Sequence, residues 1–107
     1  MNDTQKIAII EAMAKGDVLE ELLYLRDGID DREEPCSLLD AFEDLFNRCE
    51  RCGPDDGYPR SWITQTRDIA IAIGMYREVS EEQLARTIST GKKYAWKHKG
   101  KKYEYAM

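Results

Sequence analysis

The segment from Ser37 to Gly53 constrains the fold most, because its apolar residues recur with the period of an α-helix. They form one continuous stripe along the helix: Leu38, Leu39, Phe42, Leu45, Phe46 and Cys49. Ser37 is a favourable N-cap, and Gly53-Pro54 is a typical stop. The pattern therefore predicts an amphipathic helix that buries this stripe against other elements.

Two shorter helices are predicted before this segment. The first covers residues 4–15, with its N-cap among the polar residues 2–4, and Gly16 stands where a helix usually stops. Asp17 is then the expected N-cap of a second helix, which ends at Gly28. The apolar stripe of that second helix consists of Val18, Leu19, Leu22 and Leu23.

Two more helices are predicted after a stretch of turn residues at 53–60. One covers residues 61–73, and the residues that it is expected to bury are Trp62, Ile63, Thr66, Ile69, Ala70 and Ile73. We expect residues 75–79 to form the turn that follows this helix. The next helix begins at Ser80, where Gln83 completes a capping box, and it ends at Gly91. The residues of this helix that face the core are expected to be Leu84, Ala85 and Ile88.

The C-terminal segment changes from helical period to strict alternation, which predicts a β-hairpin with a two-residue turn at Lys99-Gly100. This register places Trp96 opposite Tyr103 and Lys97 opposite Lys102, and it also places Tyr94 opposite Tyr105. Because every large aromatic residue then lies on one face, the pattern supports the register.

The 107 residues and 12.4 kDa suffice for one domain with a modest core. The expected fold is mainly α: a small single domain of four to five short helices with a C-terminal β-hairpin, or α+β if the hairpin extends a sheet. The turn at 53–60 is the one candidate boundary. It would divide the chain into an acidic helical half, 1–52, and a helix-helix-hairpin half, 61–107.

The net charge of −5 conceals an uneven distribution. Residues 1–47 carry 13 acidic and 4 basic side chains, whereas residues 48–107 carry 8 acidic and 12 basic ones. Such a split predicts two faces of opposite charge, which affects the choice of partner. Three cysteines, an odd number, fit a reducing compartment, and no segment is typical of a signal peptide or a membrane span. We therefore expect a cytoplasmic protein with no membrane association.

A basic surface is the first candidate binding site. The residues expected to bind a partner there are Arg86, Lys92, Lys93, Lys97, Lys99, Lys101 and Lys102. Lysines at these positions suit phosphate groups or an acidic protein surface. The alternative is that they keep an edge strand soluble and prevent aggregation.

The order helix 62–73, turn, helix 81–90 and basic hairpin resembles the last two helices and the wing of a winged helix-turn-helix domain. The resemblance covers residues 61–107 and concerns topology. It implies that the second helix faces the DNA major groove and that the wing contacts the backbone. The groove-facing residues would be Glu81, Glu82, Arg86, Ser89 and Thr90. Two glutamates at the start of that helix and the long turn at 75–79 depart from the family pattern, and many winged helices bind proteins instead.

An acidic band is the second candidate binding site. The residues expected to contact a partner there are Asp30, Asp31, Glu33 and Glu34, in the charged segment between Gly28 and Pro35. Such a band suits a basic groove on a nucleic-acid-binding protein, in the manner of phage-type inhibitors that mimic phosphate patterns. The alternative is a solvated loop.

The cysteines form half of a zinc motif. Cys49-x-x-Cys52 has the spacing of one ligand pair, and Cys36 and His98 are the remaining candidates for a metal site. The alternative is that Cys49 packs in the core. No cofactor is expected on this interpretation.

No motif for catalysis is present in the sequence, and its single histidine leaves little for proton transfer, so we do not expect an enzyme. The function that the sequence favours is non-catalytic: a regulator or inhibitor that acts by stoichiometric binding to a protein partner, of the kind that phages direct against host machinery. The alternative is a winged-helix regulator that binds nucleic acid through its lysine-rich hairpin.

Overall fold

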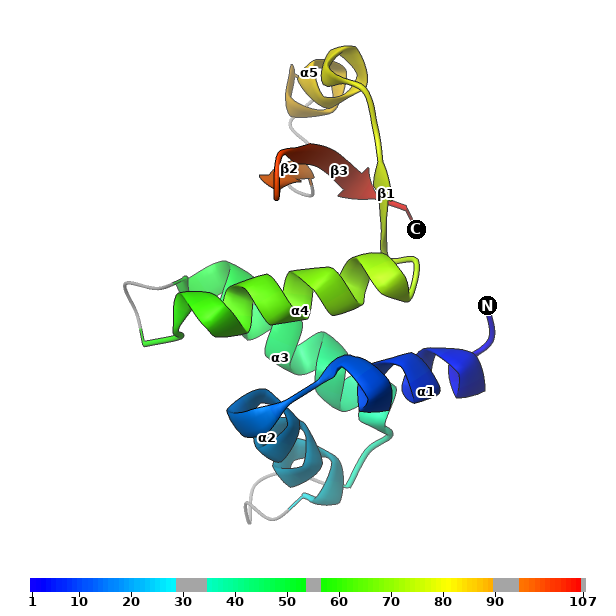
Figure 1. The fold of residues 1–107 in the computed structure, drawn as a ribbon, viewed down its shortest axis with the longest axis vertical. Helices are drawn as coiled ribbons and strands as arrows, with labels where there is room; N and C mark the ends of the chain where they lie inside the picture. Colours follow the sequence, from blue (N-terminus) through cyan, green and yellow to red (C-terminus); the bar gives the residue numbers. More distant parts are fainter. Residues whose placement is uncertain (29–34, 54–56, 90–94, 107) are drawn as a thin grey trace.

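A computed structural model describes residues 1–28, 35–53, 57–89 and 95–106. Within these ranges the protein is mainly α, with five helices and one small antiparallel sheet (Figure 1), as the sequence predicts. In chain order the elements are α1 (Asp3–Met13), α2 (Gly16–Asp27), α3 (Leu38–Cys52), α4 (Arg60–Ala72), β1 (Tyr76–Glu78), α5 (Glu81–Ser89), β2 (Ala95–His98) and β3 (Lys101–Tyr105). None of the described helices is long and apolar enough to cross a membrane.

Side-chain caps fix the starts of three helices where the sequence predicts them. Asn2 caps α1 and forms a reciprocal capping box with Gln5. The hydroxyl of Ser37 accepts the Asp40 backbone N–H at 3.1 Å at the start of α3. Ser80 and Gln83 form the predicted capping box before α5.

The predicted start of α2 is wrong. Lys15, not Asp17, is the N-cap, and it makes no side-chain cap hydrogen bond. Gly16 has a φ of +56°, so the chain reverses there and enters α2 earlier than a cap at Asp17 would allow. Asp17 lies in the first turn, where its carboxylate still interacts favourably with the helix dipole. Gly28 ends α2 in the left-handed conformation, as predicted.

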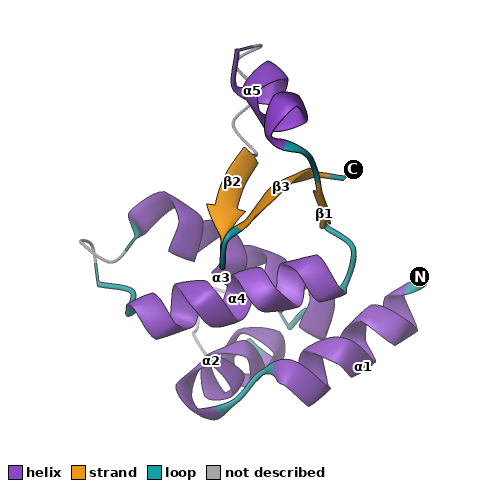
Figure 2. Ribbon diagram, turned by 45° about the horizontal axis from the view of Figure 1, so that its top comes forward, coloured by secondary structure: helices purple, strands orange, loops and turns teal. Residues whose placement is uncertain are grey.

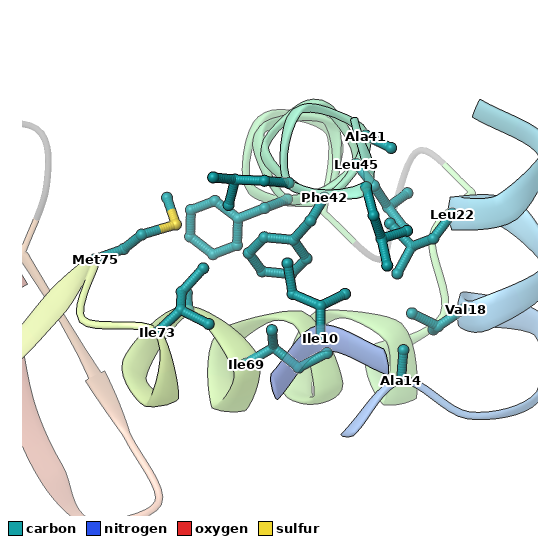
Figure 3. Close-up of a cluster of buried hydrophobic side chains, with 14 of the residues drawn as sticks. Ile10, Ala14, Val18, Leu22, Ala41, Phe42, Leu45, Ile69, Ile73 and Met75 are labelled. Atoms are coloured by element: carbon teal, nitrogen blue, oxygen red, sulfur yellow. The ribbon is translucent and has the colours of Figure 1, made fainter. Parts of the chain in front are cut away.

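The core lies between α1, α2, α3 and α4, and α3 supplies the largest share (Figure 3). All six predicted residues of its stripe are buried, and Phe42 points into the space between α3 and α4 beside Ile10 and Ile69. In α4 the predicted inward residues Thr66, Ile69 and Ala70 are buried, together with Ile73 at its C-cap, whereas Trp62 and Ile63 are partly buried. The hydroxyl of Thr66 donates to the Trp62 carbonyl at 2.9 Å, so its burial leaves no unsatisfied donor.

The segment predicted as a turn at 75–79 contains a strand, β1, which the sequence interpretation missed. It pairs with β3, and the sheet order is β1-β3-β2, antiparallel throughout. The hairpin therefore extends into a three-stranded sheet. This sheet lies between α5 and the other four helices in both ribbon views (Figures 1 and 2).

The position of β1 corrects the winged-helix comparison. In a helix-turn-helix the two helices are joined by a short turn and pack against each other. Here β1 separates α4 from α5, and α5 packs against β2 and β3 instead. The predicted core-facing residue Ala85 is exposed, whereas the side chains of Leu84 and Ile88 lie outside the described part of the structure. Thr90 and Gly91 lie outside the described residues.

Candidate functional site

The candidate site is built on the hairpin of β2 and β3, whose turn has the predicted register. Lys99 and Gly100 both have positive φ, +51° and +78°, as a two-residue hairpin turn of the favoured type requires. The turn pairs His98 with Lys101 and Lys97 with Lys102, and it places Trp96 opposite Tyr103. Both predicted pairs that lie within the described residues are confirmed, and Tyr94 lies outside them.

One carboxylate on α4 anchors this turn to the helices. Asp68 accepts a hydrogen bond from Lys99 Nζ at 2.8 Å through one oxygen, and its other oxygen lies 2.8 Å from His98 Nε2. The His98 side chain is only 8% exposed, so this contact is largely shielded from water. Burial raises the pKa of Asp68, but the hydrogen bonds from Lys99 and His98 outweigh burial and hold that pKa below its ordinary value.

One face of the sheet is apolar and lies against the helical core. Tyr76 and Tyr103 are buried on this face. The Tyr76 ring lies 5.8 Å from Phe46 of α3 and 5.6 Å from Tyr105 of β3, between ring centroids. Such tilted contacts favour a fixed orientation of the sheet on α3. Tyr103, on the aromatic side of the hairpin, is therefore part of the core.

Because side chains alternate along each strand, the basic residues of the strands lie on the opposite face of the sheet, where Lys97 is exposed and Lys102 is half-buried. We call Arg77, Lys97 and Lys102 the basic sheet face; each lies in the alternate register to the buried tyrosines. Arg77 is 66% exposed and donates to Glu104, which is 14% exposed and lies directly opposite on β3. Neither Lys97 nor Lys102 forms an ion pair with another described residue.

The other predicted basic residues do not all share this face. Lys99 contacts Asp68, and Lys101 Nζ lies 3.8 Å from Glu78 Oε2 on β1. Arg86 on α5 pairs with Glu82 one turn earlier. Lys92 and Lys93 lie outside the described residues. The sheet thus brings together two of the seven predicted basic residues and adds Arg77, which the sequence analysis did not select.

The predicted acidic band also falls outside the described ranges: Asp30, Asp31, Glu33 and Glu34. Of the acidic residues on either side of it, Asp27 pairs with Arg26 and Asp44 pairs with Arg48.

The four candidate zinc ligands do not converge. Cys36 donates to the Leu25 carbonyl at 3.6 Å before α3 begins, while Cys49 and Cys52 lie near the end of that helix. The rise of an α-helix separates Cys36 from Cys49 by roughly 20 Å. His98 contacts Asp68. The described residues contain no group of three or more His, Cys, Asp or Glu side chains that could hold a metal ion.

Cys49 instead packs in the core, the alternative that the sequence left open. It is fully buried, and burial raises the pKa of its thiol to about 11, only partly offset by a hydrogen bond with Thr66. The thiol is therefore protonated at neutral pH and is a poor nucleophile. A neighbouring cavity of about 310 Å³ opens between the end of α3 and the start of α4, where Glu50 forms a two-bond ion pair with Arg67.

Two residues of the site were missed by sequence reasoning for different reasons. Arg77 belongs to a strand of only three residues, too short to show a period. Asp68 lies on the polar side of a helical pattern, and its partners are 30 and 31 positions later, a separation that no local signal reports. Comparison of the chain with protein-family models, curated proteins and solved structures found no match.

Proposed function

We propose that this protein is a non-catalytic regulator or inhibitor that binds an acidic surface of a protein partner through the basic sheet face. The observation that carries the proposal is the position of Lys97 and Lys102. These lysines lie directly opposite each other across β2 and β3 without an ion pair among the described residues.

Hairpin stability does not account for this pair. Like charges directly opposite each other on adjacent strands destabilise a sheet, whereas opposite charges stabilise it by about 0.2–1 kcal/mol. The same face has an opposite-charge pair two residues further along β3, where Glu104 lies opposite Arg77 of β1. Lys97 and Lys102 therefore fit a role in which a partner's carboxylates supply the missing counter-charge.

A protein partner fits better than nucleic acid for two reasons. Glu104 neutralises Arg77 on this face, which leaves two lysines without a counter-charge among the described residues, too few for the run of phosphates that a nucleic acid presents, and the whole chain has a net charge of −5. In addition, α4 and α5 do not pack as the paired helices that would enter a major groove.

The remaining features of the proposal follow from the chemistry of the chain. Its buried thiol is protonated and its one histidine contacts a structural carboxylate, so stoichiometric binding is a better account than catalysis. None of the three cysteines forms a disulfide bond, which suits the cytoplasm. The small size and the two-sided charge fit a phage-type inhibitor of host machinery.

The test is capture of partners from a lysate by the tagged protein, with and without nuclease treatment. We expect one protein to be retained near one-to-one after nuclease treatment, and to be lost with the double variant Lys97→Glu/Lys102→Glu. The matched control is Lys6→Glu/Lys15→Glu, which changes the net charge equally on the helical half and should retain the partner. Loss of all partners on nuclease treatment would instead favour a nucleic-acid-binding regulator.

A further inference from the structure

Strand β2 is an edge strand, and the hydrogen-bond pattern of the sheet shows which of its backbone groups are turned outward. The sheet order is β1-β3-β2, so among the described residues β2 pairs with β3 on one side only (Figure 2). In an antiparallel sheet, alternate residues of a strand direct both backbone groups toward one neighbour and then toward the other.

The hydrogen bonds of β3 show which of its residues direct their backbone groups toward β1 and which toward β2. The Lys102 carbonyl accepts the Val79 N–H at 2.9 Å, so the backbone groups of Lys102 point toward the β1 side. Lys102 and its partner Lys97 are therefore a non-hydrogen-bonded pair in the β2–β3 ladder. The two-residue turn leads to the same assignment, because such a turn is closed by a hydrogen-bonded pair, here His98 and Lys101, and the next pair, Lys97 and Lys102, is then not hydrogen-bonded.

The backbone groups of Ala95 and Lys97 consequently point away from β3, along the outer edge of β2. The Lys97 side chain is exposed on the basic sheet face beside these groups. Edge strands are templates for an added strand, and main-chain hydrogen bonds provide affinity in such additions while side chains provide specificity. The outer edge of β1 is less suitable for an acidic segment, because β1 ends at the exposed Glu78.

We propose that the partner binds by strand addition: an extended acidic segment of the partner protein pairs with the outer edge of β2 at Ala95 and Lys97. Because side chains alternate along the added strand, every second residue of that segment lies on the basic sheet face, where carboxylates would lie beside Lys97, with Lys102 on the next strand inward. This inference rests on the proposed function and specifies how the acidic surface is recognised.

The test is amide hydrogen exchange by NMR on the full chain, with a short synthetic peptide of alternating Glu and Val as the probe. In the free protein we expect fast exchange at the Ala95 and Lys97 amides and slow exchange at Trp96 and His98, which bond to β3. Addition of the peptide should slow exchange at Ala95 and Lys97. The same peptide with Lys in place of Glu should not.

Two other outcomes are distinguishable. Perturbation of the Lys97 and Lys102 side chains without slower amide exchange would overturn strand addition and leave the proposed function standing. No change at the amides or at the side chains would overturn both.

A pair of variants at one position provides an independent test. Lys97→Thr and Lys97→Pro remove the same charge, but only Lys97→Pro removes the outward N–H, which the β2–β3 ladder does not use. We expect Lys97→Pro to bind the acidic peptide about tenfold more weakly than Lys97→Thr, the equivalent of one main-chain hydrogen bond. Equal affinities would overturn strand addition. Protection of the Trp96 and His98 amides in the free variant shows that its hairpin is intact.

Discussion

Replacement of Asp68 by Ala should detach the hairpin turn from α4, and the structure gives the size of the effect. The bond to the nearly buried His98 joins a charged group to a shielded partner, and such bonds contribute about 1.5–3 kcal/mol. The bond to Lys99, which is 62% exposed, adds about 0.2–1 kcal/mol. Alanine regains up to about 0.7 kcal/mol of helix propensity. The net expected loss of unfolding free energy is about 1–3.3 kcal/mol.

Urea and thermal unfolding, followed by circular dichroism, measure this loss. At about 4–8 °C per kcal/mol for a domain of this size, the melting temperature should fall by roughly 4–26 °C. The matched control is Glu82→Ala, which breaks the exposed pair with Arg86 and should cost about 0.5 kcal/mol or less. If Asp68→Ala were no more destabilising than Glu82→Ala, the anchoring role of Asp68 would be refuted.

Three further predictions test other parts of the account. The pKa of Asp68 is lowered from 3.8 in the folded state, so the stability that its carboxylate contributes is fully present above about pH 5 and is lost as the pH falls through the folded-state pKa. The difference in unfolding free energy between wild type and Asp68→Ala should therefore become smaller in acid. A difference that grows below about pH 4 would contradict this. Lys102→Glu places a negative charge opposite Lys97 and should raise the unfolding free energy by about 0.2–1 kcal/mol while it weakens binding to the partner. A loss of stability in denaturant titration would argue against the view that Lys97 and Lys102 repel each other. Iodoacetamide at pH 8 should label Cys52 well before Cys49, whose pKa of about 11 and full burial suppress the thiolate; mass spectrometry that finds Cys49 labelled first would contradict its placement in the core.

The sequence predicted those elements whose formation depends on neighbouring residues: the stripe of α3, the hairpin turn and the helix caps. The stripe of α3 has six apolar positions in helical period, and all are buried. The hairpin register follows from one turn, because Lys99-Gly100 adopts the positive φ angles that fix the pairing on either side. The caps at Ser37 and Ser80 follow equally from residues three positions apart.

Long-range pairing was not predictable in the same way. β1 has three residues, too few to show the alternation of a strand, and its formation depends on pairing with β3, which lies more than twenty positions later. The contact of Asp68 with His98 depends on how the sheet lies on α4. The start of α2 depends on the positive φ of Gly16, and the sequence does not show whether such a glycine ends one helix or begins the next.

The basic sheet face is the centre of the account, and calorimetric titration with the captured partner tests it most directly. We predict one-to-one binding by the wild type and by the Lys6→Glu/Lys15→Glu control, and at least a tenfold weaker affinity for Lys97→Glu/Lys102→Glu, about 1.4 kcal/mol or more. Equal affinity for all three proteins would contradict binding through this face.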